Sequence, residues 1–167
     1  MTIDTLFGTE EVTTKPRTIK FKQIKAVYET FVVREDITNY LKTGTRFTSP
    51  TQIYETFRFL NRETKEMFIS LHLDGKNRIV CMDIVSIGSL NQSIVAPREV
   101  FKTACLSSAA AIICIHNHPT GDPTPSSEDI AITRRLKEAG EIMGIKILDH
   151  IIVGDGEYCS FVERCLL

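Results

Sequence analysis

The chain has 167 residues, of which 43% are hydrophobic and 25% charged, and this composition predicts one soluble globular domain with an adequate core. Lys and Arg total 20 against 21 Asp and Glu, so the net charge of −1 lacks the basic excess of proteins that hold nucleic acid electrostatically. The apolar runs are too short to cross a bilayer, and the N-terminus lacks the features of a secretion signal. We therefore expect a cytoplasmic protein without a membrane partner, whose binding to nucleic acid is weak.

The five cysteines do not have the pattern of a disulfide framework or a zinc finger. They are odd in number, form no Cys-x-x-Cys pair and lie mostly in apolar segments; they are Cys81, Cys105, Cys114, Cys159 and Cys165. This pattern predicts reduced, buried thiols. Any metal site is therefore expected to use other ligands.

The N-terminal part differs in character from the rest of the chain. Residues 1 to about 16 are polar and rich in turn formers, and residues 18–33 alternate as in an extended segment. Basic residues give this arm a local positive charge; they are Lys15, Arg17, Lys20, Lys22 and Lys25. A solvated strand face explains these residues better than a nucleic-acid contact. We assign residues 1–44 to an N-terminal extension and residues 45–167 to the globular domain.

The first half of the domain predicts a helix followed by a hairpin. The helix begins at Ser49-Pro50, after which apolar residues recur at helical spacing, namely Ile53, Phe57 and Leu60. Residues 65–90 then alternate in hydrophobicity, with Asp74-Gly75 at the turn of a β-hairpin.

The second half continues the alternation of helices and strands. A helix begins at Pro97, and residues 110–115 form a short apolar strand; the inward residues expected on the helix are Val100, Phe101 and Cys105. Another helix is expected from about Ser126 to Ala139, with Gly140 near its C-terminal end. Residues 145–163 read as two strands about a Gly-Asp-Gly turn. Helices interleaved with a mixed sheet predict an α/β or α+β fold.

One segment, HNHPTGDPTPSSED at residues 116–129, suggests a metal site. His116 and His118 stand at positions i and i+2 at the end of the apolar strand, so both imidazoles face the same way. The stiff Pro- and Gly-rich loop that follows can fold the first turn of the next helix, with Asp129, back over the strand end. Two histidines and one carboxylate leave a fourth position for water, as in a catalytic zinc site.

Each part of this segment also has a simpler explanation. Ser126 and Asp129 have the spacing of a capping box, in which each side chain satisfies a backbone amide at a helix start. For these two residues taken alone, the capping interpretation is the stronger one. The two histidines alone are equally consistent with metal ligation and with a polar strand end.

Taken together, the spacing is more specific. The string His-x-His, seven residues, Ser, two residues, Asp falls on His116, His118, Ser126 and Asp129, and it matches the metal motif of the JAMM (MPN+) metalloproteases. The surrounding segment, residues 88–161, resembles the bacterial RadC-like JAB domain, and the likeness extends from about residue 45 to the C-terminus. The resemblance implies an α/β fold of the JAB/MPN (cytidine-deaminase-like) type, a mixed β-sheet flanked by helices.

The resemblance also implies the roles of individual residues. Zn²⁺ held by His116, His118 and Asp129 would activate a water that hydrolyses an amide bond of a peptide or protein substrate. A glutamate on an early strand would act as general base, and Ser126 would stabilise the oxyanion. The residues alone leave four candidates for the base, which are Glu63, Glu66, Glu99 and Glu128. The family's strand corresponds to residues 65–74, which selects Glu66.

Other positions of the family pattern bear on function. Asp149 and His150 belong to it and are candidates to orient a zinc ligand, although core or sheet-edge polar residues explain them equally well. Ala96 stands where many RadC-like domains have histidine, and residues 1–45 contain no Gly-rich helix-hairpin-helix segment. A zinc-dependent peptidase or isopeptidase is therefore the leading hypothesis. The alternatives are a factor for DNA repair or mobile elements that acts with nucleic acid, and a binding scaffold.

Overall fold

The computed structural model describes residues 4–5, 8–9, 25, 27–29, 44, 46–88 and 95–167. In the N-terminal part, β1 (Asp4–Thr5) pairs antiparallel with β2 (Gly8–Thr9). The extended segment predicted at 18–33 and most of the basic arm lie outside the described residues. None of the described helices has the length and apolar character required to span a membrane.

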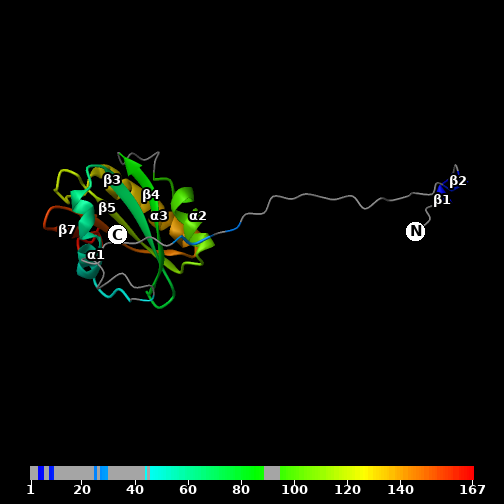
Figure 1. Ribbon diagram of the computed structural model, residues 1–167, viewed down its shortest axis with the longest axis horizontal. Helices are drawn as coiled ribbons and strands as arrows, with labels where there is room; N and C mark the ends of the chain where they lie inside the picture. The colour runs from blue at the N-terminus through cyan, green and yellow to red at the C-terminus, as the bar shows by residue number, and fades with distance from the viewer. Residues whose placement is uncertain are drawn as a thin grey trace.

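The domain is built on one five-stranded mixed sheet of order β4-β3-β5-β6-β7 (Figure 1). Its strands are β3 (Glu66–Leu73), β4 (Ile79–Gly88), β5 (Ala111–Asn117), β6 (Lys146–Val153) and β7 (Tyr158–Ser160). The expected hairpin is β3–β4, and its turn is closed by Asp74, which accepts hydrogen bonds from the amides of Lys76 and Arg78. β5 runs antiparallel to β3 and parallel to β6, so the helix between β5 and β6 crosses over the sheet.

Helices cover both faces of the sheet, which confirms the α/β class. On one face, α1 (Pro50–Phe57) and the 3-10 helix η2 (Arg58–Arg62) pack on Ile69, Leu71 and Ile113. On the other, α2 (Pro97–Leu106) and α3 (Ser127–Met143) pack on Phe68 and Cys114. Because both faces are covered, every residue of the central strand β5 is buried, which explains the continuous apolar run at residues 111–115.

Three details differ from the sequence predictions. Cys105 is exposed, and Ala104 takes the inward position beside Val100 and Phe101, which are buried as predicted. Cys165 is also exposed, so the thiols are free but not all buried. The helix predicted to end near Gly140 continues to Met143, and Gly144, with a φ of 68°, provides the left-handed C-cap.

Candidate metal centre

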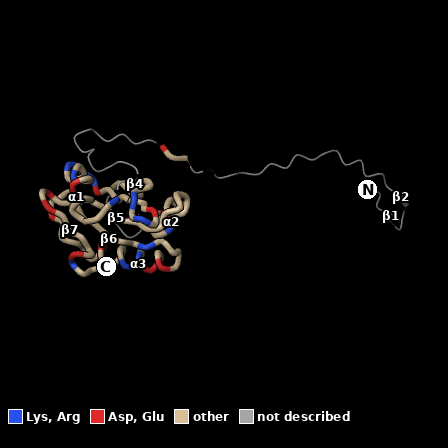
Figure 2. Tube along the Cα trace, turned by 90° about the horizontal axis from the view of Figure 1, so that it is seen from below, with Lys and Arg blue, Asp and Glu red and all other residues tan. Residues whose placement is uncertain are grey.

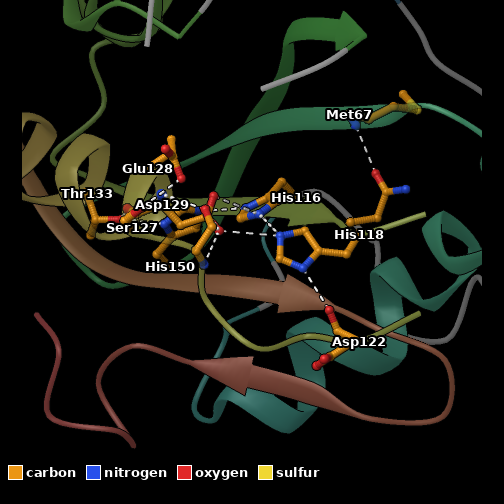
Figure 3. A network of polar contacts seen from close by, with 11 residues as sticks. Met67, His116, His118, Asp122, Ser127, Glu128, Asp129, Thr133 and His150 are labelled. Atoms are coloured by element: carbon orange, nitrogen blue, oxygen red, sulfur yellow. Dashed lines mark hydrogen bonds and ion pairs between the residues drawn. The ribbon is translucent and has the colours of Figure 1, made fainter. Parts of the chain in front are cut away.

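The three predicted ligands meet where β5 ends and α3 begins (Figure 3). His116 is the penultimate residue of β5 and is fully buried, whereas the side chain of His118, just beyond the strand, is 14% exposed. Asp129 lies in the first turn of α3 and is 3% exposed. The ligand atoms of these three residues all lie within 4.8 Å of one another, so the group could hold a metal ion.

The two imidazoles face the same carboxylate. His116 Nε2 lies 3.2 Å from Asp129 Oδ1, His118 Nε2 lies 3.3 Å from Asp129 Oδ2, and the two Nε2 atoms are 3.1 Å apart. His118 Nδ1 lies 2.7 Å from the backbone carbonyl oxygen of Asp122. A carbonyl only accepts, so Nδ1 carries the hydrogen and the Nε2 of neutral His118 presents a lone pair. This donor set suits zinc, which binds neutral imidazole nitrogen and carboxylate oxygen.

The electrostatics of the centre follow from burial and from the carboxylate. Burial lowers the pKa of His116, and Asp129 opposes this shift only in part. The hydrogen bond with Asp129 raises the pKa of the less buried His118. Burial alone would raise the pKa of Asp129, but its contacts with the two imidazoles and Ser126 lower it overall, so the carboxyl group is ionised. An anionic, buried carboxylate between two imidazoles favours a cation at this position.

The loop between His118 and Asp129 is held against the turn that follows β6. The amide of His118 donates to Val153 O (3.2 Å), and the amide of Asp155 donates to Gly121 O (2.8 Å). Gly121 has a φ of 83°, and at Gly154 a Cβ would come within 2.5 Å of Gly121 O. The loop and the turn therefore approach each other more closely than side chains would allow, and this contact places the start of α3 over the end of β5.

Ser126 forms the capping box that its spacing predicts. Its hydroxyl accepts from the amide of Asp129 (3.1 Å) and donates to Asp129 Oδ2 (2.7 Å), and its own amide donates to the same oxygen (2.8 Å). Capping does not exclude ligation here, because the Ser126 contacts all fall on Oδ2 and leave Oδ1 facing His116. The oxyanion role of Ser126 remains a prediction.

Glu66 begins β3 on the same face of the sheet as the ligands. Phe68 pairs with His116 across the antiparallel β3–β5 ladder, and side chains two residues apart share a face. Glu66 is half-buried and near enough to raise the pKa of both His116 and His118 through its charge. The position suits a general base, a role that stays a prediction.

Asn117, which the sequence interpretation passed over, anchors the backbone on both sides of Glu66. This fully buried residue accepts a hydrogen bond from the amide of Met67 at Oδ1 (2.8 Å) and donates from Nδ2 to Lys65 O (3.1 Å). The only signal in the sequence was its position between the two histidines.

The other candidate glutamates have different surroundings. Glu99, in the first turn of α2, forms ion pairs with Arg98 (3.1 Å) and Lys102 (2.6 Å). Glu63 and Glu128 are exposed, and Glu128 accepts a hydrogen bond from the neighbouring Ser127 hydroxyl. Among the four, Glu66 is the one that the structure couples electrostatically to the two histidines.

Asp149 and His150 occupy different environments, although they are adjacent in the chain. Asp149 accepts from the hydroxyl of Ser160 (2.6 Å) and from the amide of Val162 (3.0 Å), so it ties β6 to the C-terminal segment. His150 Nε2, in contrast, lies 2.8 Å from His116 Nδ1 and directly contacts a predicted ligand. Burial lowers the pKa of His150 well below its usual value.

Comparison with known proteins places the chain in a family. A profile of the RadC-like JAB domain matches residues 47–166. The chain belongs to the RadC-like JAB domain family. This confirms the resemblance inferred from the sequence, and the mixed five-stranded sheet with its helices is consistent with the JAB/MPN fold.

The chain is also similar to UPF0758 proteins of several organisms. The chain is 68% identical over 123 residues to a UPF0758 protein of Pelobacter propionicus, covering 73% of this chain and 54% of that protein. It is 56% identical over 151 residues to one of Geobacter sulfurreducens, covering 90% and 66%. A UPF0758 protein of Methanosarcina mazei is 49% identical over 146 residues, covering 87% and 63%. The chain thus spans between 54% and 66% of the length of these relatives.

Proposed function

We propose that this chain is a zinc-dependent metallopeptidase or isopeptidase of the JAMM class, which hydrolyses an amide bond with an activated water. The main support is the convergence of His116, His118 and Asp129, whose ligand atoms lie within 4.8 Å of one another. Two imidazoles and one carboxylate leave a coordination position of zinc open, as in catalytic rather than structural sites. The JAB family includes metalloproteases, which fits this chemistry.

The proposed mechanism needs metal ligands, a general base and a hydrogen-bond donor to the oxyanion. The two histidines and Asp129 would hold zinc, which supplies Lewis-acid activation of water and of the scissile carbonyl. Glu66 accepts the proton that the water loses and returns it to the leaving amine. Ser126 donates a hydrogen bond to the carbonyl oxygen as negative charge develops there. For this step its hydroxyl turns away from Asp129, to which it donates in this structure.

Metal content provides the first test of the proposal. Elemental analysis of the gently purified full chain should find about one zinc per chain, or the chain should take up one equivalent at micromolar zinc. Protein that contains no zinc and takes none up at that concentration would overturn the proposal. A screen of peptide and isopeptide-linked substrates on the zinc-loaded chain then tests hydrolysis itself.

A further inference from the structure

A buried chain of polar contacts leads from His116 away from the metal centre. His116 Nδ1 lies 2.8 Å from His150 Nε2, and His150 Nδ1 lies 2.6 Å from the hydroxyl of Thr133. That hydroxyl lies 2.6 Å from the backbone carbonyl oxygen of Asp129. The chain therefore begins at one ligand, His116, and ends on the backbone of another, Asp129 (Figure 3).

The carbonyl at the end of this chain determines the direction of each hydrogen bond. The carbonyl of Asp129 can only accept, so the single hydrogen of the Thr133 hydroxyl points to it. Thr133 must then accept from His150, which places a hydrogen on His150 Nδ1. Thr133 is 1% exposed, so water has little access to replace either partner.

The tautomer of His150 in turn determines the direction of its hydrogen bond with His116. It is fully buried, and its two ring nitrogens contact a hydroxyl and an imidazole rather than a carboxylate, so a positive charge on it would be uncompensated. Neutral His150 with hydrogen on Nδ1 has a lone pair on Nε2 and accepts from His116 Nδ1. Phe161 stacks on the ring of His150 at 4.8 Å between centroids and restricts its orientation.

We propose that Thr133 and His150 are positioning residues that hold His116 in the tautomer with hydrogen on Nδ1, so that its Nε2 lone pair faces the metal centre. His118 reaches the same tautomer by donating to the carbonyl oxygen of Asp122. The inference rests on the proposed zinc site, and it adds two residues on which metal affinity depends although neither binds the metal. Partners of this kind orient a histidine ligand and raise its basicity.

Thr133 has a matched control in the same fold. Thr56 is fully buried on α1, and its hydroxyl donates to the carbonyl oxygen of Gln52 at 2.8 Å, four residues earlier in the chain. Thr133 makes the corresponding bond to Asp129 on α3. Replacing either threonine with valine removes a buried hydroxyl of the same kind, but only Thr133 connects to a metal ligand.

The first experiment compares zinc affinities of the full chain by competition with a chromogenic chelator. Thr133→Val should weaken zinc binding roughly 10- to 100-fold, the usual effect of losing such a partner. Thr133→Ser should restore most of the affinity, and Thr56→Val should leave it unchanged. Equal zinc affinities in Thr133→Val, Thr56→Val and the unmodified chain would overturn the proposal.

A double-mutant cycle tests whether Thr133 acts through His150. His150→Leu removes the acceptor for His116 Nδ1 and should weaken zinc binding by itself. Adding Thr133→Val to His150→Leu should then have little further effect, because the connection is already broken. If the two substitutions instead weaken zinc binding independently and additively, Thr133 does not act through His150, and the two losses are separate structural effects.

Nitrogen-15 NMR of the histidine rings tests the tautomer directly and needs no variant. In the metal-free chain at neutral pH, His116 should show a protonated Nδ1 and an unprotonated Nε2. The opposite tautomer would refute the proposed positioning of His116 by Thr133 and His150, even if zinc binds. If instead the tautomer is as expected but the chain binds no zinc, the positioning of His116 is confirmed and the proposed function fails.

Discussion

At the scale of single residues, each predicted ligand is held by a partner that is not itself a predicted ligand. His118 donates to Asp122 O, His116 contacts His150, and Asp129 Oδ2 accepts from Ser126. These partners reduce the number of orientations available to each side chain before a metal arrives, so less conformational entropy is lost on binding. Mutation can test the role of the ligand Asp129 and the role of the proposed base Glu66 separately, because the two variants should affect different measurements.

Asp129→Ala should impair the metal centre itself. The variant leaves two histidines, so zinc affinity should fall, and loss of the capping contact should destabilise the fold by about 1 kcal/mol or less. Asp129→Asn keeps the side-chain size and an acceptor oxygen but not the charge, so it should lose zinc affinity with a smaller loss of stability. Calorimetric zinc titration and urea unfolding measure the two effects. Unchanged zinc affinity in both variants would exclude Asp129 as a ligand.

Glu66→Gln should impair hydrolysis without removing the metal. Glutamine keeps the size of the side chain but cannot accept the proton of water, so zinc content should stay normal while the rate drops by roughly two orders of magnitude or more. Glu99→Gln is the control, because Glu99 pairs with Arg98 and Lys102 on the surface of α2. A zinc-loaded Glu66→Gln chain that cleaves at the unmodified rate would show that the base is another group.

At the scale of elements, the centre depends on one contact between two turns. The loop before α3 packs on the turn between β6 and β7, where Gly154 meets Gly121 O and Pro123. The loop therefore has a fixed path from His118 to Asp129. The ligands come from the end of a strand and the start of a helix, so any shift of this loop separates them.

Gly154→Ala tests this contact. An added Cβ would lie 2.5 Å from Gly121 O and 2.7 Å from Pro123 Cδ, which forces the backbone to move. We expect a loss of stability of about 1–3 kcal/mol, as for other overpacked sites, and weaker zinc binding. Gly75→Ala is the control, since no atom lies within 4 Å of a Cβ there. Thermal unfolding and zinc titration of both variants provide the comparison; a Gly154→Ala chain indistinguishable from Gly75→Ala would show that the contact is unimportant.

At the scale of the whole molecule, charge gives little support to a function with nucleic acid. The net charge is −1, and in Figure 2 basic and acidic positions are interspersed over the described fold. The predicted basic arm lies mostly outside the described residues. A factor that acts with nucleic acid, the competing hypothesis from the sequence, would therefore depend on a short local patch.

Duplex DNA should accordingly bind weakly. With so little net charge, any affinity seen at low salt should vanish near 0.15 M, about physiological ionic strength. Fluorescence anisotropy across a salt series measures this, and a Lys20→Glu, Lys22→Glu variant shows whether the basic arm is responsible for the low-salt binding. A tight complex at physiological salt would make nucleic acid the first candidate for a partner.

The sequence by itself determined those features of the centre that depend only on neighbouring residues in the chain. His116 and His118 share one side because strand side chains alternate with a period of two, and Ser126 starts α3 because its hydroxyl can cap the helix. Both effects depend on neighbours within a few residues, so the spacing of the motif was sufficient. The apolar character of residues 110–115 likewise predicted a strand, which the structure buries as β5.

The rest was decided by tertiary structure, because it depends on which strands lie side by side. Glu66 faces the ligands only because β3 pairs with β5, and His150 reaches His116 only because β6 lies parallel to β5. Thr133 joins them because α3 crosses over this face of the sheet. Burial lowers the pKa of His116 and His150 and so favours their neutral forms. Burial is a property of the packed layers rather than of any short stretch of sequence.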